Sequence, residues 1–171
     1  MTPPFRRARR ARRVPVLTPA DESRIEALTV AMALAPGVYA RNRMFTLFAN
    51  PAVQHAKSRA ATLRGIVKHL DRACAVTLAR EGEGRNAAAE IDFVLRYQIP
   101  AMRLTRVAEL SRVELATLRL MAARAGASCL PPDEEDRTLV ETALARLLLA
   151  GGDSGPLARA AQDVAAPPPG Q

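Results

Sequence analysis

Residues 51–81, PAVQHAKSRAATLRGIVKHLDRACAVTLARE, contain the longest helical pattern in the chain. Asn50 and Pro51 are typical of a helix start, because an asparagine side chain caps the first turn and proline suits the first helical position. Small and apolar side chains then recur at steps of three and four, the heptad pattern of a helix that packs along another helix. We call seven of them the seam: Val53, Ala56, Ala60, Leu63, Val67, Leu70 and Cys74. The pattern predicts a helix of roughly 45 Å.

The seam could be buried in two ways. It could pack against another helix of the same chain, as in a bundle, or it could zip to a second chain, because the heptad pattern serves both arrangements. Its small residues would let either partner approach closely. The second arrangement makes the seam a candidate surface for a protein partner or for self-association.

The segment LTPADESRIEALTVAMALAPG, residues 17–37, predicts a second helix before this one. Thr18 is the expected N-cap, Pro19 takes the first helical position, and the acids that follow suit the positive end of the helix dipole. Ile25, Leu28, Met32 and Ala35 are expected on one face, and Pro36-Gly37 ends the element.

Further helices are expected towards the C-terminus. A long segment, about 87–125, contains Pro100, which must kink or end a helix. Ser111 and Glu114 have the spacing of a capping box, which marks either a restarted helix or an exposed pair within a continuous one. The last strong helix covers about 132–149, and a weak one lies near 157–164. A short helix near 38–49 concentrates half of the aromatic residues and is expected to plug the core.

These elements predict an all-α fold. Hydrophobic residues make up 49% of the 171, but aromatics only 4%, which favours helices over sheet. We expect a helical bundle of four to five main helices with at least one long antiparallel pair. The expected domains are a disordered arginine-rich arm at 1–17, a single bundle at 18–152, and a weak helix with a disordered proline-rich tail at 153–171.

Positive charge is concentrated before the bundle. The formal net charge is +8, and the six arginines of the arm leave only +2 for the rest: Arg6, Arg7, Arg9, Arg10, Arg12 and Arg13. On a helix these side chains would point round most of the circumference, so the arm is better interpreted as an unstructured polycation that binds phosphates without reading sequence. A basic face on the long helix could extend this surface, although it could equally be an ordinary solvated face; its residues are Lys57, Arg64, Lys68 and Arg72, with Arg41 and Arg43 nearby.

No residue pattern indicates catalysis or a metal. The chain lacks the glycine-rich phosphate loops, the nucleophile elbow and the paired histidine motifs of known enzyme classes. His55 and His69 lie roughly 21 Å apart on one helix, so they cannot share an ion. We therefore expect no cofactor and no metal.

The sequence favours a non-enzymatic helical interaction module: an adaptor, an assembly subunit or a regulatory protein. One alternative is a nucleic-acid-binding protein that uses the arm and the basic helix face, and another is an enzyme without a recognisable motif. A cytoplasmic location is expected, because no apolar run is long enough to span a bilayer. The stretch ALTVAMALA after the arginines resembles the core of a signal peptide, but Asp21, Glu22 and Glu26 interrupt that pattern.

Overall fold

The computed structural model describes residues 17–37, 50–80, 110–125 and 132–167, with the side chains of these ranges except those of 69–80 and Asp153. These residues form five α-helices and one short 3-10 turn, and no strand occurs among them, which confirms the all-α prediction. The helices are α1 (Pro19–Leu34), α4 (Pro51–Arg80), α7 (Arg112–Arg124), α8 (Glu134–Leu149) and α9 (Gly155–Ala165). The arm, the aromatic segment at 38–49 and Pro100 lie outside the described residues.

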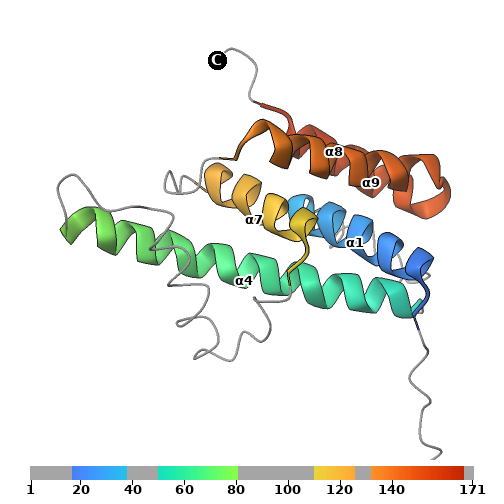
Figure 1. Cartoon of the computed structure of the whole chain (residues 1–171), viewed down its shortest axis with the longest axis horizontal. Coiled ribbons are helices and arrows are strands. Elements are labelled where there is room, and N and C mark those ends of the chain that lie inside the picture. Colours follow the sequence, from blue (N-terminus) through green and yellow to red (C-terminus); the bar gives the residue numbers. More distant parts are fainter. Residues whose placement is uncertain (1–16, 38–49, 81–109, 126–131, 168–171) are drawn as a thin grey trace, which may run out of the picture.

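Helix α1 is the centre of the bundle. It contacts all four other helices, with α4 on one side and α8 and α9 on the other (Figure 1). Its caps form as predicted: the Thr18 hydroxyl accepts from the Asp21 amide at 3.2 Å, and the Asp21 carboxylate accepts from the Thr18 amide at 2.9 Å. Every residue from Ala27 to Ala35 is buried, not only the predicted face, because the apolar run leaves no polar side to turn towards water.

Helix α4 begins and ends within one residue of the prediction. The side-chain oxygen of Asn50 accepts from the Ala52 amide at 2.9 Å, so Asn50 caps the helix. Helix α4 lies parallel to α1, since Arg59 pairs with Glu22 near the start of α1 and Arg64 reaches Met32 near its end. The heptad pattern therefore serves the contact between these two helices of one chain.

Helix α7 begins directly after Ser111, so the capping box marks a helix start. The Ser111 hydroxyl accepts from the Glu114 amide at 3.2 Å, and the Glu114 carboxylate accepts from the Ser111 amide at 3.0 Å. Helix α7 runs parallel to α4, because Glu114 lies beside Arg59, and Met121 lines the same hollow as Val67. The connection of residues 81–110 is long enough to permit either direction, so the sequence could not decide it.

The two C-terminal helices form a tight hairpin. Asp133 and Asp136 make the capping box that begins α8, and Gly151 and Gly152 adopt φ values of 67° and 73°, which favour glycine, directly after it ends. Helix α9 then returns to α1, and its Leu157, Ala158 and Ala161 are buried in the core. The bundle therefore extends past the predicted domain boundary at residue 152, because small side chains on one face of α9 allow close packing. At the other end, Leu17, assigned above to the arm, packs against the core.

Within the described ranges, no helix has both the length and the hydropathy needed to cross a membrane.

Candidate functional site

The seam is used inside the bundle. Val53, Ala56, Ala60 and Leu63 are 0% exposed and Val67 is 9% exposed. The side chains of Leu70 and Cys74, the last two seam residues, are not described. The five described members pack within the core of their own chain, so they offer no surface to a second molecule.

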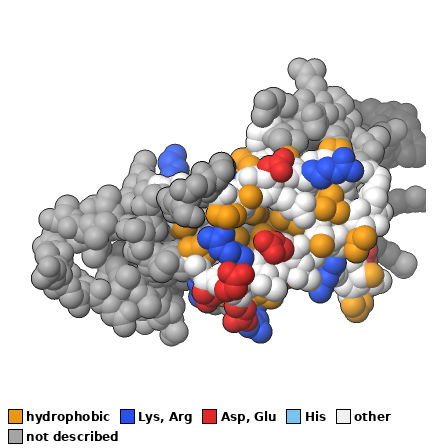
Figure 2. All heavy atoms as spheres, turned by 90° about the horizontal axis from the view of Figure 1, so that it is seen from above, with side chains coloured by type: hydrophobic (Ala, Val, Ile, Leu, Met, Phe, Trp, Pro, Cys, Tyr) orange, Lys and Arg blue, Asp and Glu red, His pale blue; other side chains and the backbone are white. Residues whose placement is uncertain are grey.

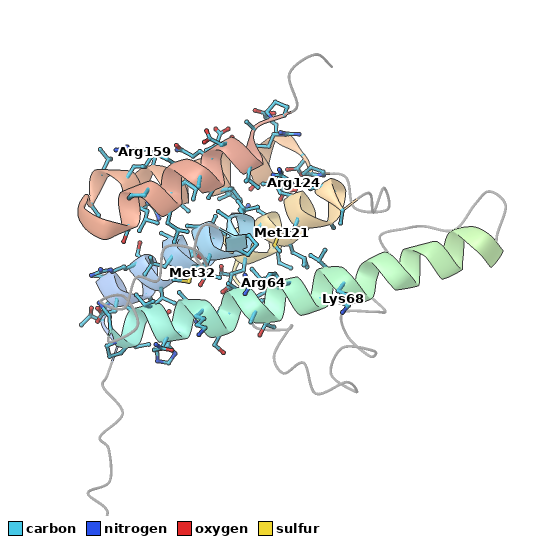
Figure 3. All side chains as sticks on the ribbon, turned by 180° about the vertical axis from the view of Figure 1, so that it is seen from behind. Met32, Arg64, Lys68, Met121, Arg124 and Arg159 are labelled. Carbon is cyan, nitrogen blue, oxygen red and sulfur yellow. The ribbon has the colours of Figure 1, made fainter. Side chains whose placement is uncertain are left out.

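The predicted basic face of α4 is only partly a surface. Lys57 and Lys68 are exposed, and Lys68 points away from the other helices (Figure 3). Arg64 instead turns towards α1 and donates from Nη1 to the Met32 carbonyl at 3.0 Å. The side chain of Arg72, together with Arg41, Arg43 and the six arginines of the arm, lies outside the described part of the chain. Of the predicted phosphate-binding residues the structure therefore describes three side chains, and two of them, Lys57 and Lys68, are exposed.

Arg64 has a structural task at the end of α1. The Met32 carbonyl belongs to the last turn of that helix, where backbone acceptors have no partner within the helix. Partial burial lowers the pKa of Arg64, but an arginine stays charged at neutral pH. A cation at this place also offsets the negative end of the helix dipole.

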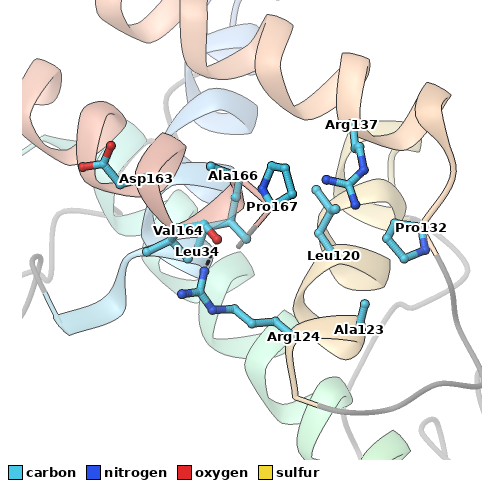
Figure 4. Close-up of a pocket in the computed structure, with 11 residues that line it drawn as sticks. Leu34, Leu120, Ala123, Arg124, Pro132, Arg137, Asp163, Val164, Ala166 and Pro167 are labelled. Carbon is cyan, nitrogen blue, oxygen red and sulfur yellow. Dashed lines mark hydrogen bonds between the residues drawn. The ribbon is translucent and has the colours of Figure 1, made fainter. Parts of the chain in front are cut away.

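Arg124 performs the same task for α9. It is the last residue of α7, and its Nη1 donates to the carbonyl of Val164 in the last turn of α9 (Figure 4). Helices α1, α7 and α9 therefore end close together, with their negative dipole ends on one side of the bundle. Two arginines stabilise this arrangement, each satisfying one backbone carbonyl.

A two-lobed hollow lies where these three helices end, and we call it the helix-end groove. The larger lobe encloses about 730 Å³ and the smaller about 390 Å³. Leu34, Arg124 and Val164 line both lobes, so the lobes adjoin at the Arg124 side chain. The larger lobe adds Leu120, Pro132, Arg137, Asp163 and Pro167, and the smaller adds Arg64, Val67 and Met121.

Arg137 differs from the other two arginines of the helix-end groove. It extends from α8 into the larger lobe, above Leu120 (Figure 4). Among the described residues, no hydrogen bond or ion pair involves its guanidinium. Asp163, the acid of this lobe, points away from it (Figure 4). The groove therefore presents one cation that no described side chain neutralises.

Polar contacts also join the helices where α7 begins. The Ser111 hydroxyl donates to Glu26 of α1 at 2.6 Å while it caps its own helix. Glu114 is 3% exposed, and its Oε1 has no hydrogen-bond partner among the described atoms but lies 3.7 Å from Nε of Arg59. Arg119 and the buried Asp136 pair at 2.9 Å between α7 and α8. These contacts hold helices together, and Arg119 and Asp136 line a smaller hollow of about 230 Å³ between α7 and α8.

The remaining charges do not form a catalytic or metal site in the described ranges. No three His, Cys, Asp or Glu side chains in those ranges are placed to hold an ion. Figure 2 shows one face of the molecule: basic side chains are scattered among apolar ones on this face, and several acidic side chains are gathered at one edge of it. The helix-end groove combines an apolar floor with charged side chains at its rim.

Sequence reasoning missed Arg124, Arg137 and their groove. A cation in the last turn of a helix, just before Gly126, is expected to cap that same helix, whereas Arg124 of α7 donates to the end of α9. No local signal indicates Arg137, because its role depends on which helices end opposite to it.

Comparisons with known proteins identify no relative. No family model, no curated protein and no solved structure matches this chain.

Proposed function

We propose that this protein is a non-enzymatic helical interaction module that binds a partner protein at the helix-end groove. One observation carries the proposal: a hollow with an apolar floor and arginines at its rim lies where three helices end. Specific protein interfaces combine an apolar centre with a polar rim and are enriched in arginine. The seam cannot supply this surface, because its described members are core residues.

Site-specific cross-linking tests this proposal. A photo-reactive amino acid replaces Ala123, which is exposed in the groove, in protein expressed in its native host. The matched control carries the same group at Ala145, which is exposed on α8 outside the groove. We expect a nuclease-resistant protein adduct from position 123 only. Adducts at both positions, at neither, or only with nucleic acid would contradict the proposal.

A second candidate function is nucleic-acid binding by the arm. The observation that favours it is the run of six arginines with no acid in residues 1–17. Such a segment contacts phosphates without base readout, and its affinity falls steeply with salt. The folded body adds Lys57 and Lys68 at most among the described residues of its predicted face, since Arg64 is engaged with α1.

A cytoplasmic location is part of the same proposal. It rests on the acids Asp21, Glu22 and Glu26, which belong to the capped start of α1. N-terminal sequencing of protein from the native host tests it. Intact α1 is the expected result, and Pro36 as the first residue would contradict it.

A further inference from the structure

We infer that the partner segment that binds in the helix-end groove is an amphipathic helix that places a carboxylate opposite Arg137. This inference rests on the proposed function and adds to it the chemistry of the partner. Three features of the groove support it: its floor, its openness and its unbalanced charge.

The floor of the groove is apolar and continuous. Leu34 and Leu120 are 6% and 9% exposed, so each shows only a small area to the hollow, and the half-buried Met121 and Val164 extend it. Filling such a floor with apolar side chains removes further apolar area from water on both partners. The ligand must therefore carry several apolar groups on one side.

The rim of the groove is open. Ala123, Arg124, Asp163, Ala166 and Pro167 are all exposed although they line the hollow. A small molecule usually needs a site that encloses most of its surface, whereas a groove of this kind takes one face of a helix. The two adjoining lobes suit two successive turns of such a helix, with apolar residues at intervals of three and four.

Charge then selects the polar side of that helix. Arg64 and Arg124 each already donate to a backbone carbonyl, and three helix C-termini add partial negative charge nearby, so these two guanidiniums are largely balanced. Arg137 lies in the first turns of α8, at the positive end of that helix dipole. Its guanidinium has no described partner. A carboxylate beside it would accept two charge-assisted hydrogen bonds from the guanidinium, whereas a lysine there would be repelled.

Selection from a displayed peptide library tests the inference. Each member is an amphipathic helix of about 15 residues with a fixed leucine stripe, and its flanking positions vary among Glu, Lys and Ser. The library is selected on the full-length chain, on Arg137→Glu and on the control Arg159→Glu. Arg159→Glu changes the charge by the same amount, and Arg159 lies on α9, far from Arg124 (Figure 3). The new glutamate at position 137 lies near the N-terminus of α8, where an acid is tolerated.

We expect Glu-flanked peptides to be enriched on the unmodified chain and on Arg159→Glu, and Lys-flanked peptides on Arg137→Glu. A selected Glu peptide should bind Arg137→Glu about tenfold more weakly or worse in fluorescence polarisation. Its Lys counterpart should recover affinity for that variant. Enrichment without a charge preference, or the same preference on all three proteins, would overturn the inference.

Two further outcomes would also overturn it. One is that no peptide is enriched. The other is that vesicles of anionic phosphatidylglycerol bind the chain and displace the selected peptide from the groove. The cross-linking experiment stays separate from these results. A protein adduct at position 123 without a Glu preference leaves the proposed function standing and removes only the chemistry assigned to the partner. Absence of that adduct contradicts the proposed function itself.

Discussion

The two ends of this bundle treat their helix termini differently. Where α1 and α7 begin, short side chains close the terminus from within: Thr18 and Ser111 each form a reciprocal capping box. Where α1 and α9 end, the terminal carbonyls instead accept from arginines that come from neighbouring helices. In a capping box, the polar side-chain atoms are hydrogen-bonded to the first turn of their own helix. A guanidinium that bridges two helices still has N–H donors left over, and it lies at the edge of a groove. The first end therefore stabilises single helices, whereas the second joins neighbouring helices.

Both ends depend on one core, so we expect Leu63→Asp to lower the free energy of unfolding more than any other substitution proposed below. Leu63 is 0% exposed, and an unpaired carboxylate there should cost more than about 4 kcal/mol and unfold the bundle. Circular dichroism during heating measures this loss. The control Ala61→Asp, at an exposed position two residues earlier, should change stability by about 0.5 kcal/mol. Equal melting temperatures for both variants would contradict the described packing of α4.

The next largest effect concerns the capped end. Ser111→Ala should destabilise the fold by about 2 kcal/mol, because it removes an N-cap and also leaves the Glu26 carboxylate without its 2.6 Å donor. Urea unfolding measures the change. Ser58→Ala, on the exposed side of α4, is the matched control and should be neutral. A loss no greater than that of the control would mean that Ser111 does not join α7 to α1.

The groove end should be less sensitive. Arg124→Met keeps the aliphatic stem but removes the donor to the Val164 carbonyl, which should cost about 1 kcal/mol. Hydrogen exchange of the amides in the last turn of α9 should accelerate. The control Arg159→Met keeps both helix ends and should leave exchange unchanged. If the two variants exchange alike, the arginine does not hold this end.

A pH dependence distinguishes the two ends further. Hydrogen bonds from the Thr18 backbone and hydroxyl lower the pKa of Asp21. The folded state therefore binds the proton less readily, so this contribution to stability is complete above the ordinary pKa of 3.8 and is lost as the pH falls through the lower, folded value. Asp21→Asn removes the titrating carboxyl, so it should flatten the dependence of the unfolding free energy on pH in this acid range. The slope should persist in Arg124→Met, and a slope that survives Asp21→Asn would contradict the assignment.

The smallest expected effect on either end comes from deleting residues 1–16, which spares Leu17. A segment with so little apolar surface should leave the melting temperature nearly unchanged. The informative measurement is nucleic-acid affinity against salt: full engagement of six arginines gives a slope near −5 for duplex DNA, and the deletion should remove most of it. No measurable affinity at low salt for the intact chain would exclude nucleic acid as the second candidate function.

Helix starts and the length of α4 could be predicted from the sequence. Thr18, Asn50 and Ser111 each cap the helix that follows them in the sequence. The five described seam residues are buried, as a heptad pattern requires. Caps and periodicity are local, because each depends on residues within one or two turns. The candidate site could not be predicted in this way, since Leu34, Arg124, Arg137 and Val164 come from four different helices.

The sequence by itself determined an all-α chain, its capped helices and the separation of a basic arm from a nearly neutral body. Only the tertiary structure decided that α1 is surrounded on all sides, that α4 and α7 run parallel to it, and that α9 joins the core. The tertiary structure also decided that Arg64, predicted as a surface cation, caps the end of α1 and that Arg137 lines a groove. The physical reason is that helix formation depends on neighbours along the chain. Helix direction and the setting of each charge depend instead on contacts between residues far apart in sequence, through connections long enough to allow more than one arrangement.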